Sequence, residues 1–142
     1  MNNNDMEYLM RTNLSPWIQK ATRLKEIPRK IYGGTSNMFR HQMQTMSILI
    51  DHNCIETVTL KSSVIHDLIE EYPDEDKSLL ERIDSDGIEV VKTVIELTKS
   101  KDEPKYVYLE RIQKYGSDRA KIIKAADRID NLLQINLANF PG

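Results

Sequence analysis

The chain has 142 residues, of which 39% are hydrophobic and 30% charged, and its formal net charge is −2. This length matches one domain whose core needs no disulfide, and the single cysteine, Cys54, fits a reducing cytoplasm. The acidic balance excludes a general electrostatic grip on DNA or RNA, and the N-terminal residues lack a signal-peptide pattern. We therefore expect a cytoplasmic protein with no DNA, RNA or membrane partner.

Apolar residues at three- and four-residue spacing, with capping and breaking residues between them, predict helices joined by short loops. Ser15-Pro16 looks like an N-cap followed by proline at the first helical position, and Pro28 ends that helix. A glycine pair predicts a loop over residues 31–36. The only strand-like fragment, Thr57 to Leu60, lies in a helical context. The expected fold is all-α, one domain over residues 1–142, with helices over residues 16–26, 37–53, 56–72, 74–83, 88–100, 103–115 and 117–137, a turn over 84–87 and a loop over 138–142.

The stretch from Val64 to Glu71 sets a histidine and an aspartate side by side among apolar residues. Burying such a pair without partners is costly, so the pair indicates metal binding or catalysis. On a continuous helix His66 and Asp67 would diverge by about 100°, with Glu70 and Glu71 one turn later on the same two faces. The alternative is a core histidine with satisfied hydrogen bonds beside a solvated acidic helix end.

Two other predicted helices carry residues of the same kind. His41 lies on the preceding helix, among apolar positions. Near the C-terminus Asp127 and Asn131 share one helix face, and Lys124 and Arg128 share another. Each segment alone is also compatible with a packed histidine or a salt-bridged amphipathic helix. Together, two histidines and two aspartates form a nitrogen and oxygen ligand set that suits manganese, iron, cobalt or magnesium better than a structural zinc.

In chain order, His41, His66-Asp67 and Asp127 resemble the H…HD…D signature of the HD-domain metal-dependent phosphohydrolases. The segments HDLIEE and KAADRIDNL resemble the HDxxED and KLADRxxNL motifs of the hydrolase domain in RelA/SpoT-type alarmone enzymes, in their small stand-alone form. The resemblance covers about residues 36–133. It implies a helical HD-domain bundle in which His41, His66, Asp67 and Asp127 bind a divalent metal, with manganese as the favoured ion.

The resemblance also implies roles for residues around the metal. Glu70 and Glu71 match the acidic pair that handles water and protons, although the family has Glu-Asp there. Arg29-Lys30 resembles a family Arg-Lys pair that packs near the guanine, with about three extra residues before His41. The remaining candidates for substrate binding are on the last predicted helix: Lys124, Arg128 and Asn131.

The leading hypothesis from the sequence is metal-dependent hydrolysis of the 3′-pyrophosphate of (p)ppGpp, a reaction of the stringent response. One alternative is another HD nucleotide phosphohydrolase, of the 5′-monophosphatase type. The other is a catalytically weak HD module that binds a nucleotide for regulation. Each assigns a small nucleotide as the partner, and each is compatible with a homo-oligomer.

Overall fold

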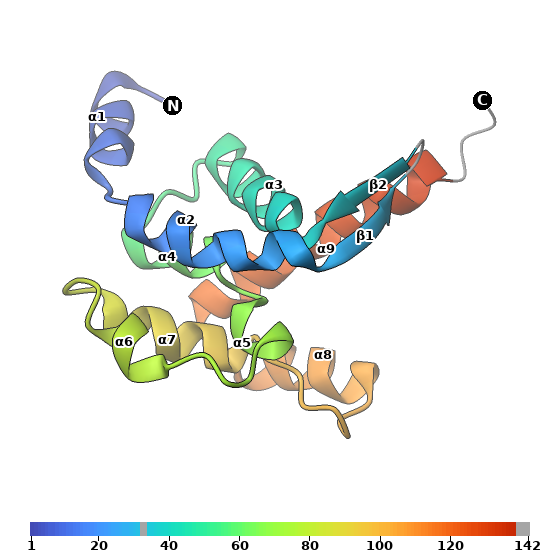
Figure 1. Ribbon diagram of the computed structural model, residues 1–142. Helices are drawn as coiled ribbons and strands as arrows, with labels where there is room; N and C mark the ends of the chain where they lie inside the picture. Colours follow the sequence, from blue (N-terminus) through green and yellow to red (C-terminus); the bar gives the residue numbers. More distant parts are fainter. Residues whose placement is uncertain (32–33, 139–142) are drawn as a thin grey trace.

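Helices form nearly all of the regular structure, so the predicted all-α class is confirmed (Figure 1). The computed structural model describes residues 1–31 and 34–138, with side chains as far as residue 133. In chain order the elements are α1 (Asn3–Arg11), α2 (Ser15–Ala21), the 3₁₀ helix η1 (Thr22–Glu26), β1 (Pro28–Ile31), β2 (Gly34–Asn37), α3 (Met38–Asp51), α4 (Thr57–Val64), α5 (Leu68–Glu71), α6 (Lys77–Glu81), α7 (Gly87–Glu96), α8 (Lys105–Tyr115) and α9 (Asp118–Ala138).

Helix α4 lies at the centre of the molecule, and every residue from Val58 to Val64 is buried. Its apolar side chains contribute to two hydrophobic clusters. Val58 and Val64 join one cluster with α2, η1, α5, α6 and α7, while Leu60 joins the other with α3, α8 and α9. A helix that is buried on all sides has no face toward solvent, so its polar groups can find partners only inside the protein, and among the described side chains Ser62 Oγ has none.

The N-terminal half differs from the prediction in two places. Helix α1 was not expected, and a capping box between Asn2 and Asp5 starts it. The predicted loop over residues 31–36 is wrong at its ends, because β1 and β2 form an antiparallel hairpin in which Arg29 pairs with Ser36. Residues 32–33 of that prediction lie outside the described part of the chain. The hairpin runs beside the C-terminal part of α9, and both extend from the body of the molecule (Figure 1).

The predicted helix over residues 56–72 is wrong in one important respect. It is interrupted after Val64, and α5 starts only at Leu68. At this break the backbone N–H groups of Ile65 and His66 donate to the carbonyl oxygens three residues earlier, Ser62 at 3.3 Å and Ser63 at 3.5 Å. The break therefore places the His66-Asp67 pair in a turn between two helices rather than on one continuous helix.

The remaining predicted helices are present with shifted ends. Helix α7 begins at Gly87, where a Cβ atom would collide with the backbone of Glu81 in α6, so the close approach of the two segments requires glycine. Helix α9 continues to Ala138, and residues 139–142 of the predicted terminal loop lie outside the described part. Across the described residues, no helix combines the length and hydropathy that a membrane span requires.

Candidate metal centre

Four side chains from three parts of the fold converge on one point. His41 comes from the first turns of α3, His66 and Asp67 from the break between α4 and α5, and Asp127 from the middle of α9. One nitrogen or carboxylate oxygen from each lies within 4.8 Å of all the others. These four residues, called the His/Asp cluster below, are the four that the sequence predicted as metal ligands.

Distances within the His/Asp cluster are short. The Nε2 atom of His41 lies 2.6 Å from Asp127 Oδ1 and 3.6 Å from Asp67 Oδ2. The Nε2 atom of His66 lies 3.2 Å from Asp127 Oδ1 and 3.1 Å from Asp67 Oδ2. Both imidazoles therefore present the same ring nitrogen to the same two carboxylates. The break after Val64 makes this convergence compatible with adjacent positions in the sequence.

The second ring nitrogen of each histidine is occupied elsewhere. Nδ1 of His66 lies 2.6 Å from the Ser63 carbonyl oxygen, which can only accept a hydrogen bond. Nδ1 of His41 lies 2.6 Å from Oδ2 of Asp130. A neutral imidazole has one N–H group, and these acceptors take it at Nδ1. Each Nε2 then presents a lone pair toward carboxylate oxygens, an arrangement of acceptors that is stable only around positive charge.

The pKa values in the cluster reflect the same demand for positive charge. Burial lowers the pKa of His66, but Asp67 and Asp127 outweigh it and raise this pKa to about 10. Burial raises the pKa of Asp67, but His66 outweighs it and lowers this pKa to about 2. The pKa of Asp127 is lowered by His41 and His66 in spite of its burial. The two nitrogen and two carboxylate donors thus fit a divalent cation of the kind that the sequence indicated.

The sequence did not predict two residues that support the cluster. Gln42 is fully buried and holds Asp67 from two sides. Its Nε2 donates to Asp67 Oδ2 at 2.8 Å, and its Oε1 accepts from the Asp67 backbone N–H at 3.1 Å. Asp130 holds His41, as described above. A weak signal was available in each case, because Gln42 adjoins His41 and Asp130 lies one helical turn beyond Asp127.

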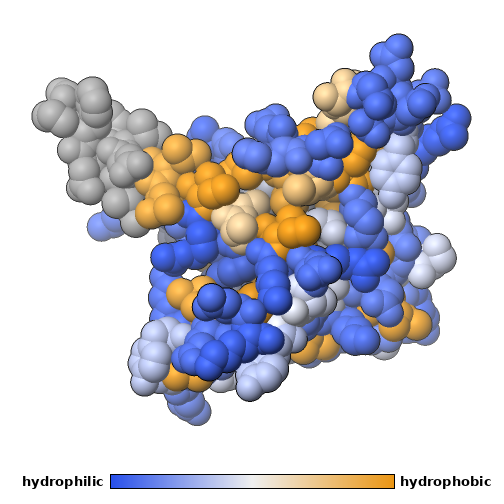
Figure 2. Space-filling view, turned by 180° about the vertical axis from the view of Figure 1, so that it is seen from behind, coloured by the Kyte–Doolittle hydropathy of each residue, from blue (hydrophilic) through white to orange (hydrophobic). Residues whose placement is uncertain are grey.

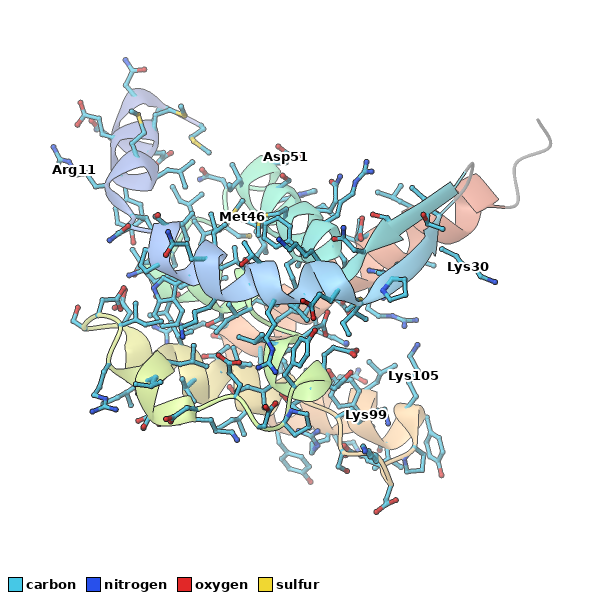
Figure 3. All side chains as sticks on the ribbon, viewed as in Figure 1. Arg11, Lys30, Met46, Asp51, Lys99 and Lys105 are labelled. Carbon is cyan, nitrogen blue, oxygen red and sulfur yellow. The ribbon has the colours of Figure 1, made fainter. Side chains whose placement is uncertain are left out.

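The His/Asp cluster borders a cavity of about 320 Å³ through His41, Asp67 and Asp127. Of the predicted site residues, Glu70, Lys124, Asn131 and Arg29 line this cavity with it. The cavity also contains residues to which the sequence gave no firm role, namely Met38, Lys99, Lys105 and Tyr108. Lys99 and Lys105 lie near each other on the same side of the molecule (Figure 3). The cavity lining therefore combines carboxylates and one imidazole with four basic side chains.

Lys124 contacts both the His/Asp cluster and the aromatic ring of Tyr108 in this cavity. Its Nζ donates to Asp127 Oδ2 at 2.8 Å and lies 4.8 Å from the centre of the Tyr108 ring. Burial lowers the pKa of Lys124, but Asp127 outweighs it and raises this pKa. Lys124 therefore remains a cation next to the cluster. Elsewhere in the cavity lining, Arg29 donates to Asn131 Oδ1 at 2.6 Å.

Four of the predicted residues, His66, Lys30, Arg128 and Glu71, are not among those that line this cavity in the described part of the chain. Lys30 is exposed and extends from the hairpin into solvent (Figure 3). Arg128 lies in a separate groove between α8 and α9, with Leu109 and Ile112. Glu71 is partly buried, and burial, Asp67 and Glu70 all raise its pKa. For Lys30 and Arg128 the predicted contact with substrate finds no support in their positions.

No protein-family model matches this chain, and no curated protein matches it in sequence. Among solved structures, it is similar to one described as a metazoan ortholog of SpoT that hydrolyzes ppGpp and plays a role in starvation responses. The two share 27% sequence identity with a TM-score of 0.75, over 91% of this chain and 73% of the other. In its fold and in its convergent histidines and aspartates, this chain resembles the HD-type ppGpp hydrolases.

Proposed function

We propose that this protein is a metal-dependent phosphohydrolase that removes the 3′-pyrophosphate of (p)ppGpp. The observation that carries the proposal is the position of the His/Asp cluster at the wall of a cavity that basic side chains surround. An anionic phosphate group has no reason to approach two carboxylates unless a metal lies between them. The basic side chains then provide the attraction that the carboxylates alone would oppose.

The proposed metal is a single divalent ion, with manganese favoured, held by His41, His66, Asp67 and Asp127. When bound, such an ion lowers the pKa of water and neutralises charge on phosphoryl oxygens. The histidines contribute Nε2 because Nδ1 is fixed by Ser63 and Asp130. Gln42 keeps the Asp67 carboxylate turned toward the cluster through its two hydrogen bonds. Those contacts restrict the rotation of both ligand types before any ion binds.

Glu70 is the proposed general base. The Lys99 backbone N–H donates to Glu70 Oε1 at 2.9 Å, which holds the carboxylate at the cavity. Burial and Asp67 raise the pKa of Glu70, whereas the Lys99 hydrogen bond lowers it, and the net pKa is raised. A raised pKa makes the carboxylate a better proton acceptor. Glu71 is proposed as the second acid of the pair, which supports Glu70 from behind.

The basic side chains are proposed to bind the phosphates of the substrate. Lys124 lies next to Asp127 and would contact the reacting diphosphate, while Lys99 and Lys105 would contact its other phosphates. Arg29 and Asn131 form the wall that would face the nucleoside. The reaction adds water to phosphorus, breaks the bond to the 3′ oxygen and leaves GDP and inorganic pyrophosphate when ppGpp is the substrate. A role in the stringent response, a cytoplasmic location and a homo-oligomer remain predictions from the sequence.

The proposal is tested by incubating the purified chain and Mn²⁺ with ppGpp, GDP, GTP or GMP and separating the products by ion exchange. We expect GDP and pyrophosphate from ppGpp, and no product when EDTA replaces Mn²⁺. Phosphate released from GMP, with ppGpp intact, would contradict the alarmone assignment and favour a monophosphatase. Tight binding of ppGpp without turnover would instead favour the regulatory module.

A further inference from the structure

Asp130 is a buried carboxylate that belongs neither to the His/Asp cluster nor to the side chains found to line its cavity. Its side chain is 5% exposed, and its Oδ2 lies 2.6 Å from Nδ1 of His41. The contact joins residues 89 positions apart in the sequence. A carboxylate with so little access to water is destabilising unless its partners compensate for the lost hydration. The strength and burial of this contact indicate that it serves the histidine that it holds.

Asp130 cannot be a fifth member of the His/Asp cluster in this geometry. It lies against Nδ1 of His41, whereas the cluster lies against Nε2 of the same ring. The imidazole therefore stands between the Asp130 carboxylate and the proposed metal position. A second cation, Arg29, approaches Asp130 Oδ2 only to 3.9 Å and donates its shorter hydrogen bond to Asn131. The principal partner of Asp130 is thus His41.

We propose that Asp130 is a positioning residue that sets the metal affinity of the site through His41. The inference rests on the proposed function, because it assumes that His41 binds the metal. The carboxylate holds the proton on Nδ1, which leaves the lone pair on Nε2, and its negative charge makes Nε2 a stronger donor to a cation. His66 has only the neutral Ser63 carbonyl in the same place. His41 is therefore the stronger of the two imidazole donors.

The arrangement also connects the proposed metal to the cavity wall. Asp130 and Asn131 are adjacent on α9, and Arg29 from β1 contacts both of them. One turn of α9 thus fixes the orientation of His41 and of Arg29 together. Removing the Asp130 side chain should therefore loosen His41. Changing an exposed residue of α9 should leave His41 in place.

The test measures metal binding in the absence of nucleotide. Mn²⁺ is titrated calorimetrically into the full chain after EDTA treatment, for the wild type, Asp130→Ala, Asp130→Asn and the control Asp118→Asn. Asp118 is an exposed carboxylate on the same helix, so the control removes one charge of the same sign. We expect Asp130→Ala to weaken Mn²⁺ binding by about 10- to 100-fold. Asp130→Asn should weaken it less, since the amide oxygen still accepts from Nδ1 but carries no charge.

A second measurement reads the imidazole directly. Long-range ¹H–¹⁵N NMR of the Zn²⁺-loaded protein should show His41 protonated at Nδ1 in the wild type and in Asp130→Asn, and this signal should shift or vanish in Asp130→Ala. Circular dichroism checks that each variant is folded. If the alanine variant does not fold, the asparagine variant decides, and unchanged Mn²⁺ affinity there overturns the inference. Equal affinity in all folded variants overturns the inference alone, whereas a wild type that binds no Mn²⁺ overturns the proposed function with it.

Discussion

Two charged clusters involve α4, one through Lys61 on the helix and one through His66 and Asp67 just after its end, and they differ in how their hydrogen bonds are satisfied. In the first, Lys61 is 6% exposed and donates to Asp84 at 2.9 Å and to Asp86 at 2.8 Å. Trp17 adds a hydrogen bond to Asp84 at 2.9 Å. Every short contact in this Lys61 cluster joins a donor to an acceptor. The cluster is therefore complete with protein atoms alone.

The His/Asp cluster is arranged in the opposite way. Ser63 and Asp130 accept hydrogen bonds at Nδ1, so in neutral imidazoles the Nε2 atoms that face Asp67 and Asp127 are acceptors, and these contacts need added positive charge, as the raised pKa of His66 also indicates. A protein gains nothing from such a group unless it holds a cation. The comparison teaches that burial of charge alone does not indicate a functional site. The useful criterion is whether the protein's own donors and acceptors match.

Replacing Asp67 with alanine should give the largest effect, because it removes one donor from the incomplete cluster. We expect loss of bound Mn²⁺ and of ppGpp hydrolysis to background, since the remaining donors cannot hold the ion in place. Metal content after gel filtration and ppGpp turnover measure both. The fold should survive, as shown by unchanged circular dichroism. Equal metal content in the wild type and in this variant would remove Asp67 from the ligand set.

Replacing Glu70 with glutamine separates proton transfer from metal binding. The amide has nearly the same shape but accepts no proton, so turnover of ppGpp should fall by about 10²- to 10⁴-fold. Mn²⁺ affinity should stay within the error of the wild-type value, because Glu70 lies outside the His/Asp cluster. Glu71→Gln is the matched comparison, with a smaller loss expected. An unchanged rate in Glu70→Gln would show that this residue is not the base.

Replacing Lys61 with alanine should instead damage stability and spare the site. The change leaves two carboxylates without their shared cation, and such losses cost about 3–5 kcal/mol when the partners are fully buried. Asp84 and Asp86 are 25% and 28% exposed, so we expect a decrease of about 2–3 kcal/mol in the free energy of unfolding. Urea unfolding measures it. The exposed Lys114→Ala should change stability by less than about 0.5 kcal/mol, and equal losses in the two variants would contradict the comparison.

Asp84 should make part of the stability depend on pH. Burial raises the pKa of Asp84, but Trp17 and Lys61 outweigh it and lower this pKa below its ordinary value. A carboxyl whose pKa is lower in the folded state stabilises above its unfolded pKa and loses that contribution as the pH falls through the folded pKa. Wild-type stability should therefore decline below about pH 4 more steeply than that of Asp84→Asn. Fluorescence of the single tryptophan during urea unfolding at several pH values measures both slopes, and parallel slopes would exclude Asp84 as the cause.

The sequence predicted the His/Asp cluster because its residues form a recognisable signature, but it did not predict how the chain presents them. Val64, Ile65, Leu68 and Ile69 are all buried, so the apolar pattern continues across the break that follows α4. No local pattern marks the break, at which the structure brings His66 Nε2 to Asp127 while its Nδ1 contacts the Ser63 carbonyl. Asp130 and Gln42 were missed for a similar reason, because their partners are remote in the sequence or belong to another helix.

Some exposed features also depend on the tertiary arrangement. The hairpin strands are short and polar, without alternation of apolar residues, so no local pattern distinguishes them from a loop. Exposed apolar side chains on α9, namely Ile129, Leu132 and Leu133, interrupt an otherwise amphipathic helix. Figure 2 shows hydrophobic residues beside the grey C-terminal atoms, in the region where α9 extends from the body. Helical periodicity assigns the residues of α9 to faces, but it does not show which of them line the cavity.

This ambiguity explains the position of Arg128 and leads to the prediction with the smallest expected effect. The sequence grouped Arg128 with Lys124 as a phosphate contact, but Arg128 faces the groove beside Leu109 whereas Lys105 lines the cavity. Each replacement with alanine removes one positive charge, so the pair tests position at constant charge. An exposed ion pair contributes about 0.2–1 kcal/mol, so Lys105→Ala should raise KM for ppGpp by about 2- to 5-fold with kcat nearly unchanged.

Arg128→Ala should leave KM and kcat within about twofold of the wild-type values, because its guanidinium does not line the cavity. The KM effect of Lys105→Ala should also shrink as salt is raised, since screening weakens attraction between exposed charges. Initial rates at low and moderate salt measure both variants. A larger loss in Arg128→Ala would mean that phosphate binds over the groove between α8 and α9. The basic residues around the His/Asp cluster would then not account for substrate attraction. The His/Asp cluster would differ from the Lys61 cluster in metal binding alone.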